Sequence, residues 1–128
     1  MLKRHNPPTV APPFSRYSHG VEAPAKARWL VISGQVGVTP EGEVQNGAKA
    51  QIEQAWRNLM NVLQPAGMGP HDLVKVTIFL VDRAHLQILR EIRDAVLQGA
   101  APASTLIFVA GLASPDWLVE IEAIAAAA

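Results

Sequence analysis

Apolar residues recur at intervals of three and four in the segment of residues 48–63. Its apolar positions are Ile52, Ala55, Trp56, Leu59, Val62 and Leu63. The polar positions on the other side are Gln51, Glu53, Gln54, Arg57 and Asn58. This pattern predicts an amphipathic helix that covers one face of a sheet. We expect the helix to end near Pro65 and Gly67, because proline disrupts a helix and glycine accepts the left-handed conformation.

A second stripe with helical spacing follows Asp82, which stands where an N-cap residue belongs. Its apolar positions are Leu86, Leu89, Ile92 and Val96. The pattern predicts a second helix that ends at Gly99 and packs beside the first. Arg90 and Arg93 lie on its polar side, so we expect both to be solvated.

Five segments are rich in β-branched and apolar residues and predict strands. They are residues 17–22, 28–33, 73–81, 104–110 and 118–125. We expect the first two to form a hairpin. The third is nearly continuous in apolar character, which is typical of a central strand buried on both faces. The last two are joined by the turn-forming Ser114-Pro115-Asp116, and Thr39-Pro40-Glu41-Gly42 predicts another turn.

The order of these elements, β-β-α-β-α-β-β, predicts one α+β domain. Two helices would cover one face of a mixed sheet of roughly five or six strands. The other face would then lack a cover, which calls for a partner chain. Residues 1–14 are rich in proline, so we expect an extended arm with little helix or strand of its own, followed by a single domain over residues 15–128.

Composition narrows the possible functions. The 128 residues include no cysteine, which excludes thiolate catalysis and fits a reducing compartment, so we expect a cytoplasmic protein. Eleven basic residues balance eleven acidic ones and form no stripe, which argues against a nucleic-acid partner. No run is long enough to span a bilayer, and prolines follow the basic pair at the amino terminus, so we expect no membrane association. An apolar content of 49% with 17% charged residues favours apolar surface buried between subunits.

Two carboxylates are the clearest candidates for chemistry. Glu120 and Glu122 alternate with Val119, Ile121 and Ala123, so both lie on one face of the last strand. They suit general acid–base catalysis or a hard metal ion, or they are ordinary charges that face solvent or another subunit. No cofactor or metal is expected, because the four histidines have no metal-binding spacing and no aspartate or histidine stands near the pair.

Two other features are candidates for a small-molecule site. Ser33-Gly34-Gln35 follows a predicted strand and reads as a tight strand exit whose amides either face a ligand or form a plain turn. Tyr17, the only tyrosine, is either a packing residue or part of a pocket.

Several motifs stand in an order that is informative as a whole. They are Tyr17, Ser33-Gly34-Gln35, LVKVTIFLVD at residues 73–82, Pro102-Ala103, and VEIEAIA at residues 119–125. This order resembles the Rid family, also called YjgF or reactive-intermediate deaminases and once labelled endoribonuclease L-PSP. The resemblance extends over residues 17–125.

The resemblance implies a chorismate-mutase-like fold and a homotrimer with three clefts between subunits. Enzymes of the family hydrolyse enamines and imines such as 2-aminoacrylate to keto acids and ammonia, without a cofactor. Their cleft uses a tyrosine matching Tyr17 and the strand-end backbone near Ser33 and Gly34. It also uses a glutamate matching Glu120 that orients water, and an arginine directly after Pro-Ala that binds the substrate carboxylate.

The sequence departs from the family at this arginine. Pro102-Ala103 is followed by Ser104 and Thr105, so the chain resembles the arginine-lacking branches. A neutral hydroxyl cannot supply the bidentate, charge-assisted contact that arginine gives a carboxylate. Three hypotheses follow. The protein is a hydrolase in which Glu120 positions water while Tyr17, Ser104 and Thr105 donate or accept hydrogen bonds, or it is a trimer that binds or senses a metabolite without turnover. RNA cleavage, which the family's older name suggests, is the weakest, because the chain has no basic stripe.

Overall fold

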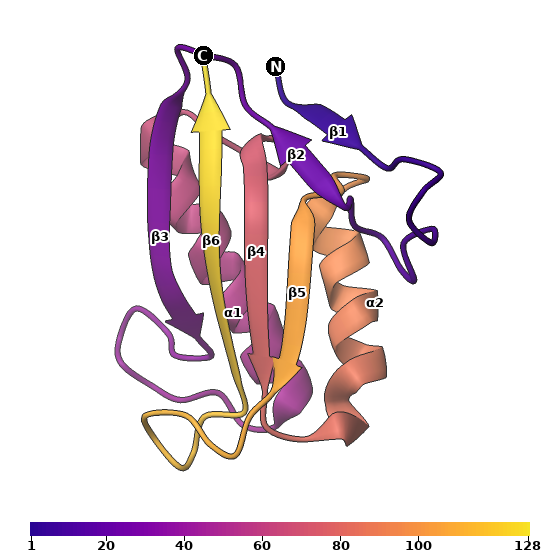
Figure 1. Cartoon of the computed structure of the whole chain (residues 1–128). Coiled ribbons are helices and arrows are strands. Elements are labelled where there is room, and N and C mark those ends of the chain that lie inside the picture. Colours follow the sequence, from indigo (N-terminus) through magenta and orange to yellow (C-terminus); the bar gives the residue numbers. More distant parts are fainter.

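The computed structural model describes residues 1–128 as a four-stranded mixed sheet with two helices on one face and a separate pair of short strands (Figure 1). The helices are α1 (Ala48–Leu63) and α2 (Leu86–Leu97), and the strands are β1 (Lys3–His5), β2 (Gly20–Glu22), β3 (Arg28–Val36), β4 (Leu73–Leu80), β5 (Ala103–Phe108) and β6 (Val119–Ala127). The main sheet has the order β3-β6-β4-β5; β6 is antiparallel to both neighbours and β4 is parallel to β5. The predicted α+β class, the one-sided helix layer and the central position of β4 are confirmed.

The predicted hairpin between residues 17–22 and 28–33 is wrong. Strand β2 pairs with β1, with Arg4 opposite Val21, and this pair lies beside the ends of β4 and β5 in Figure 1. Ser18 determines this path, because its hydroxyl donates to the Ala101 carbonyl at 2.6 Å and its N–H donates to the Pro102 carbonyl at 3.1 Å. The main sheet therefore has four strands instead of five or six, and residues 1–14 contain one short strand.

Helix α1 covers the predicted residues, but its polar side is not fully solvated. Gln51 and Gln54 are buried, contrary to expectation. The Gln51 amide donates to the carbonyls of Gln45 and Asp116 at 3.1 and 3.0 Å and accepts from the Leu118 N–H at 2.8 Å. Buried polar groups need such partners. Gln51 thus joins the loop that precedes α1 to the loop between β5 and β6.

Helix α2 begins one turn later than predicted. Asp82 caps the 3₁₀ turn Arg83–His85 that leads into α2, by accepting from the Ala84 N–H at 2.9 Å. The helix ends at Leu97, after which Gln98 and Gly99 both have positive φ. Glycine at the second of these positions accepts the left-handed conformation without strain, as expected.

The core lies between the helices and the sheet and includes Trp56, Leu59, Ile78, Leu89 and Ile121, all fully buried. Strand β4 is buried on this side only: Val76 and Ile78 are inaccessible, whereas the intervening Lys75, Thr77 and Phe79 are partly exposed. The expectation that both faces are buried is therefore wrong for the single chain. Figure 1 shows no helix over the opposite face, which we call the open face. Neither helix is long and apolar enough to cross a membrane.

Candidate functional site

Strand register places the predicted site residues on two faces of the sheet. Ser104 pairs with Val76, which is buried beneath the helices, whereas Thr105 pairs with Thr77 on the open face. Glu120 pairs with Phe79 on the open face. Successive strand residues point to opposite faces, so Ser104 and Thr105 cannot line the same side of β5.

Glu120 lies over the backbone of Gly34. A Cβ atom at Gly34 would overlap the Glu120 carboxylate and would stand 2.7 Å from its Cδ. Glycine at this position therefore allows the carboxylate to approach strand β3 closely. None of the hydrogen bonds or ion pairs within the chain involves the Glu120 carboxylate, which is half-buried. Its oxygens are available to water or to a ligand.

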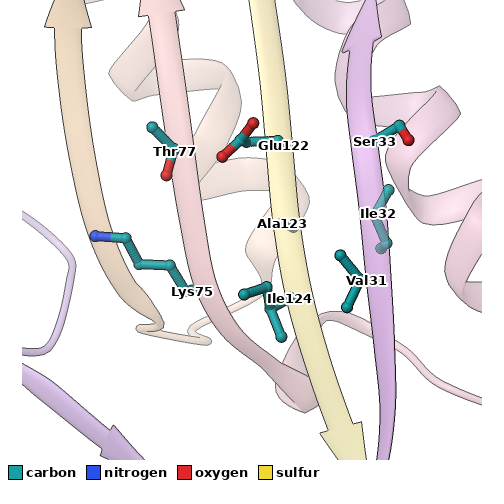
Figure 2. A pocket seen from close by; sticks show the side chains of 8 residues that line it. All are labelled: Val31, Ile32, Ser33, Lys75, Thr77, Glu122, Ala123 and Ile124. Atoms are coloured by element: carbon teal, nitrogen blue, oxygen red, sulfur yellow. The ribbon is translucent and has the colours of Figure 1, made fainter.

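A second carboxylate, Glu122, lines a cavity of about 210 Å³ on the same face. Figure 2 shows Glu122 between Thr77 and Ser33, with Val31 and Ile124 further along the cavity. Lys75 extends toward β5, where its Nζ donates to Thr105 Oγ1 at 2.5 Å. The two glutamates share a face as their alternation predicts, and Lys75 and Thr77 join them as residues that the sequence did not single out.

Tyr17 and Ser104 line a different cavity, of about 310 Å³, between β5, α2 and the arm. We call it the helix-side groove. Its apolar lining consists of Phe14, Leu86, Leu106 and Phe108, and its polar lining of Ser15, Tyr17, Arg90, Arg93 and Ser104. The Tyr17 hydroxyl accepts from the Phe14 N–H at 3.2 Å, and its ring meets His19 edge-on at 5.8 Å between centroids. Because Ser18 is anchored to Ala101 and Pro102, just before β5, Tyr17 is held in the lining of this groove.

Arg93 is only 4% exposed, so the expectation that it is solvated is wrong. Its guanidinium donates to Ser15 Oγ and to Asp94 Oδ1, both at 3.1 Å. The sequence did carry a signal of burial, because Arg93 lies four residues from both Leu89 and Leu97, which are buried on the same helix face. A polar residue between two core positions is thus a candidate for a buried role.

The six predicted site residues do not meet in one cavity of a single chain. Tyr17 and Ser104 share the helix-side groove, while Ser33, Gly34, Thr105 and Glu120 belong to the open face. No group of three histidine, aspartate or glutamate side chains stands close enough together to hold a metal ion.

Comparisons with known proteins agree with this architecture. The family model for endoribonuclease L-PSP matches residues 8–127. The chain is 37% identical to the mouse 2-iminobutanoate/2-iminopropanoate deaminase over 85% of its own length and 79% of that protein. It is 32% identical to the Escherichia coli deaminase of the same name over 85% of each chain.

A solved structure extends the likeness to three dimensions. The Rid-family protein YyfB from Yersinia pestis, described as a protein of unknown function, is 38% identical and superimposes with a TM-score of 0.87 over 97% of both chains. RidA from an Antarctic Psychrobacter is 34% identical with a TM-score of 0.73 over 88% of this chain and 89% of the other. Sequence, fold and the order of motifs all agree, and the chain belongs to the Rid family, the family of endoribonuclease L-PSP.

Proposed function

We propose that this protein is a cofactor-free hydrolase of a small imine, enamine or related compound, acting in a cleft between the subunits of a homotrimer. In such a reaction water adds to the C=N carbon, a proton moves to the nitrogen, and the C–N bond breaks to leave a carbonyl compound and ammonia. Relatives named 2-iminobutanoate/2-iminopropanoate deaminase support this reaction class.

The unpartnered Glu120 carboxylate carries the proposal. It is half-buried and held over the Gly34 backbone, and no cation of the chain neutralises it. A carboxylate in this state is suited to orient water and to accept its proton as the water attacks. Strand β3 does not end at Ser33 and Gly34, as the sequence predicted, but continues to Val36. Its pairing with β6 shifts register between Ile32 and Gln35, and this bulge leaves backbone groups next to the carboxylate for the reacting centre.

Assembly would bring the separated residues together. The open face exposes Trp29 by 58% and Val31 by 75%, and such apolar surface is typical of subunit contacts. A C₃ arrangement of the chain would place Tyr17 and Ser104 of one subunit against Glu120, Gly34 and Ser33 of the next. Thr105 would then face the partner from the open side of β5.

A second candidate is a trimer that binds or senses a metabolite without turnover. Ser104 supports it, because the groove has no arginine on β5 to fix a substrate carboxylate in the reactive position. In that case the same cleft would bind a ligand, and Glu120 would contribute to affinity only.

Ammonia release from a panel of imines and small amides distinguishes the two candidates. We expect release by the wild type to fall by about two or more powers of ten in Glu120→Gln, which keeps the side-chain shape but removes the base. Glu53→Gln, which alters an exposed carboxylate on α1, is the matched control. Ligand binding without any ammonia release would favour the sensor, and undiminished turnover in Glu120→Gln would refute the role of Glu120.

A further inference from the structure

The helix-side groove has an unusual combination of linings. Four apolar side chains, Phe14, Leu86, Leu106 and Phe108, form its walls, yet two arginines of α2 enter the same cavity of about 310 Å³. A third arginine is adjacent, because the Arg83 guanidinium lies 4.6 Å from the centroid of the Phe108 ring. The groove is thus apolar in its body and positively charged along α2.

The two arginines that line the groove differ in their hydrogen bonds and ion pairs. Arg93 donates to Ser15 and forms an ion pair with Asp94 at 3.0 Å, so its charge is compensated and its position fixed. Arg90 is half-buried, and no hydrogen bond or ion pair within the chain involves it. Asp94 is the only acidic residue paired with these arginines, and it also faces Arg16 at 3.9 Å. Arg90 therefore brings an uncompensated charge into a partly desolvated cavity.

We propose that the helix-side groove binds a small carboxylic acid with an apolar or aromatic body, and that Arg90 binds its carboxylate. Arg90 would thereby supply from α2 the charge that Ser104 does not supply from β5. The guanidinium fork suits a planar carboxylate, and Phe14, Leu106 and Phe108 suit an apolar body. The inference rests on the proposed function in that it assigns the substrate class of the same cleft. On this proposal 2-aminoacrylate is a poor ligand of the wild type, since so short an acid leaves most of the apolar lining without a contact.

Calorimetric binding of phenylacetate to the intact protein tests the proposal without any turnover. The neutral isostere phenylacetamide and the short acid acetate are the comparison ligands. We expect the wild type to bind phenylacetate at least about tenfold more tightly than either, since a charge-assisted contact and the buried ring each contribute on this order. Arg90→Gln should weaken phenylacetate binding about tenfold and leave phenylacetamide binding unchanged.

Three variants make the result specific. Arg57→Gln removes an arginine from the exposed side of α1 and should bind like the wild type. Arg90→Lys keeps the charge and should retain most of the affinity. In the double variant Arg90→Gln/Ser104→Arg, an arginine enters the same groove from β5, so phenylacetate binding should return.

The proposal is overturned if phenylacetate and phenylacetamide bind the wild type equally, or if Arg90→Gln binds phenylacetate as the wild type does. The proposed hydrolase fails on a separate measurement, namely the absence of ammonia release or its persistence in Glu120→Gln. Carboxylate binding that depends on Arg90 in a protein without turnover would support this inference and identify the protein as one that binds its ligand without converting it.

Discussion

The two faces of the main sheet carry different kinds of residue on the same strands. Under the helices, Val76, Ile78 and Ile121 are inaccessible and belong to the apolar core. On the open face, Lys75, Thr77 and Glu120 alternate with them, and Val31 remains 75% exposed. Because a strand alternates its side chains, one sequence specifies the core on one face and leaves the other face for the contacts and chemistry proposed above.

Because the two faces differ, substitutions at neighbouring residues of one strand should have different effects. A substitution under the helices should alter the stability of each chain, whereas a substitution one residue along should alter assembly or ligand contacts. Strand β3 offers the sharpest pair, since Ile32 is 3% exposed and Val31 is 75% exposed. Ser104 and Arg90 line the helix-side groove beside β5, so substitutions at these two residues should alter ligand binding and not the stability of the chain.

The largest effect is expected from a charge on the open face. Val31→Asp would bury an unpaired carboxylate in each of three subunits if this face packs within a homotrimer, at a cost of about 3–5 kcal/mol for each. We expect the trimer to dissociate, which light scattering would detect. Val10→Asp places the same charge on the exposed arm and should leave the mass unchanged. A wild type that is monomeric at micromolar concentration would refute the trimer.

Truncation of the neighbouring residue should act on folding instead. Ile32→Ala removes buried methyl groups from the core and should lower the free energy of unfolding by about 2–5 kcal/mol. Val31→Ala should have a smaller effect on the same quantity. Urea denaturation at one fixed protein concentration measures both, since assembly makes apparent stability depend on concentration. Equal losses in the two variants would contradict the division between faces.

The sequence predicted where helices and strands lie better than it predicted which strands pair with each other. The spacing of Ile52, Trp56 and Leu59 defined α1 because a helix is local and its period is visible along the chain. The pairing of β2 with β1 was not visible, because it depends on the contacts of Ser18 with residues 101 and 102, which lie far away in sequence. Alternation within a strand does not identify the strand it pairs with.

Prediction of the candidate site was limited in the same way, because contacts between segments far apart in the sequence were not visible. Alternation correctly placed Glu120 and Glu122 on one face, and their relation to Gly34 followed only from the tertiary structure. Ser104 and Thr105 were assigned to one site as sequence neighbours, yet strand geometry separates them. Arg90 stayed among the solvated residues in the prediction because the groove that it lines is formed by three segments distant in sequence.

A gain of function at Ser104 tests the groove directly. The wild type should hydrolyse 2-aminoacrylate hardly faster than water does, whereas Ser104→Arg should improve carboxylate binding by about one to two powers of ten, or roughly 1.5–3 kcal/mol. Imino-acid hydrolysis and keto-acid binding measure the two steps separately. Efficient deamination by the wild type that survives Glu120→Ala would show that the reaction occurs outside this cleft.

The smallest effect concerns two threonines that face the same side of adjacent strands. Thr105 accepts a hydrogen bond from Lys75 on the open face, whereas its register partner Thr77 takes part in no side-chain hydrogen bond. Replacement by valine keeps the shape of each side chain and suits a strand. We expect Thr105→Val to lower the free energy of unfolding by about 0.5–1 kcal/mol, because an exposed hydrogen bond contributes little beyond its competition with water. Thr77→Val should be neutral or slightly stabilising in the same denaturation experiment. If Thr77→Val proves the more damaging of the two, then Thr77 has a polar partner that assembly or a ligand provides, and the open-face cavity beside Glu122 would be where to look for it.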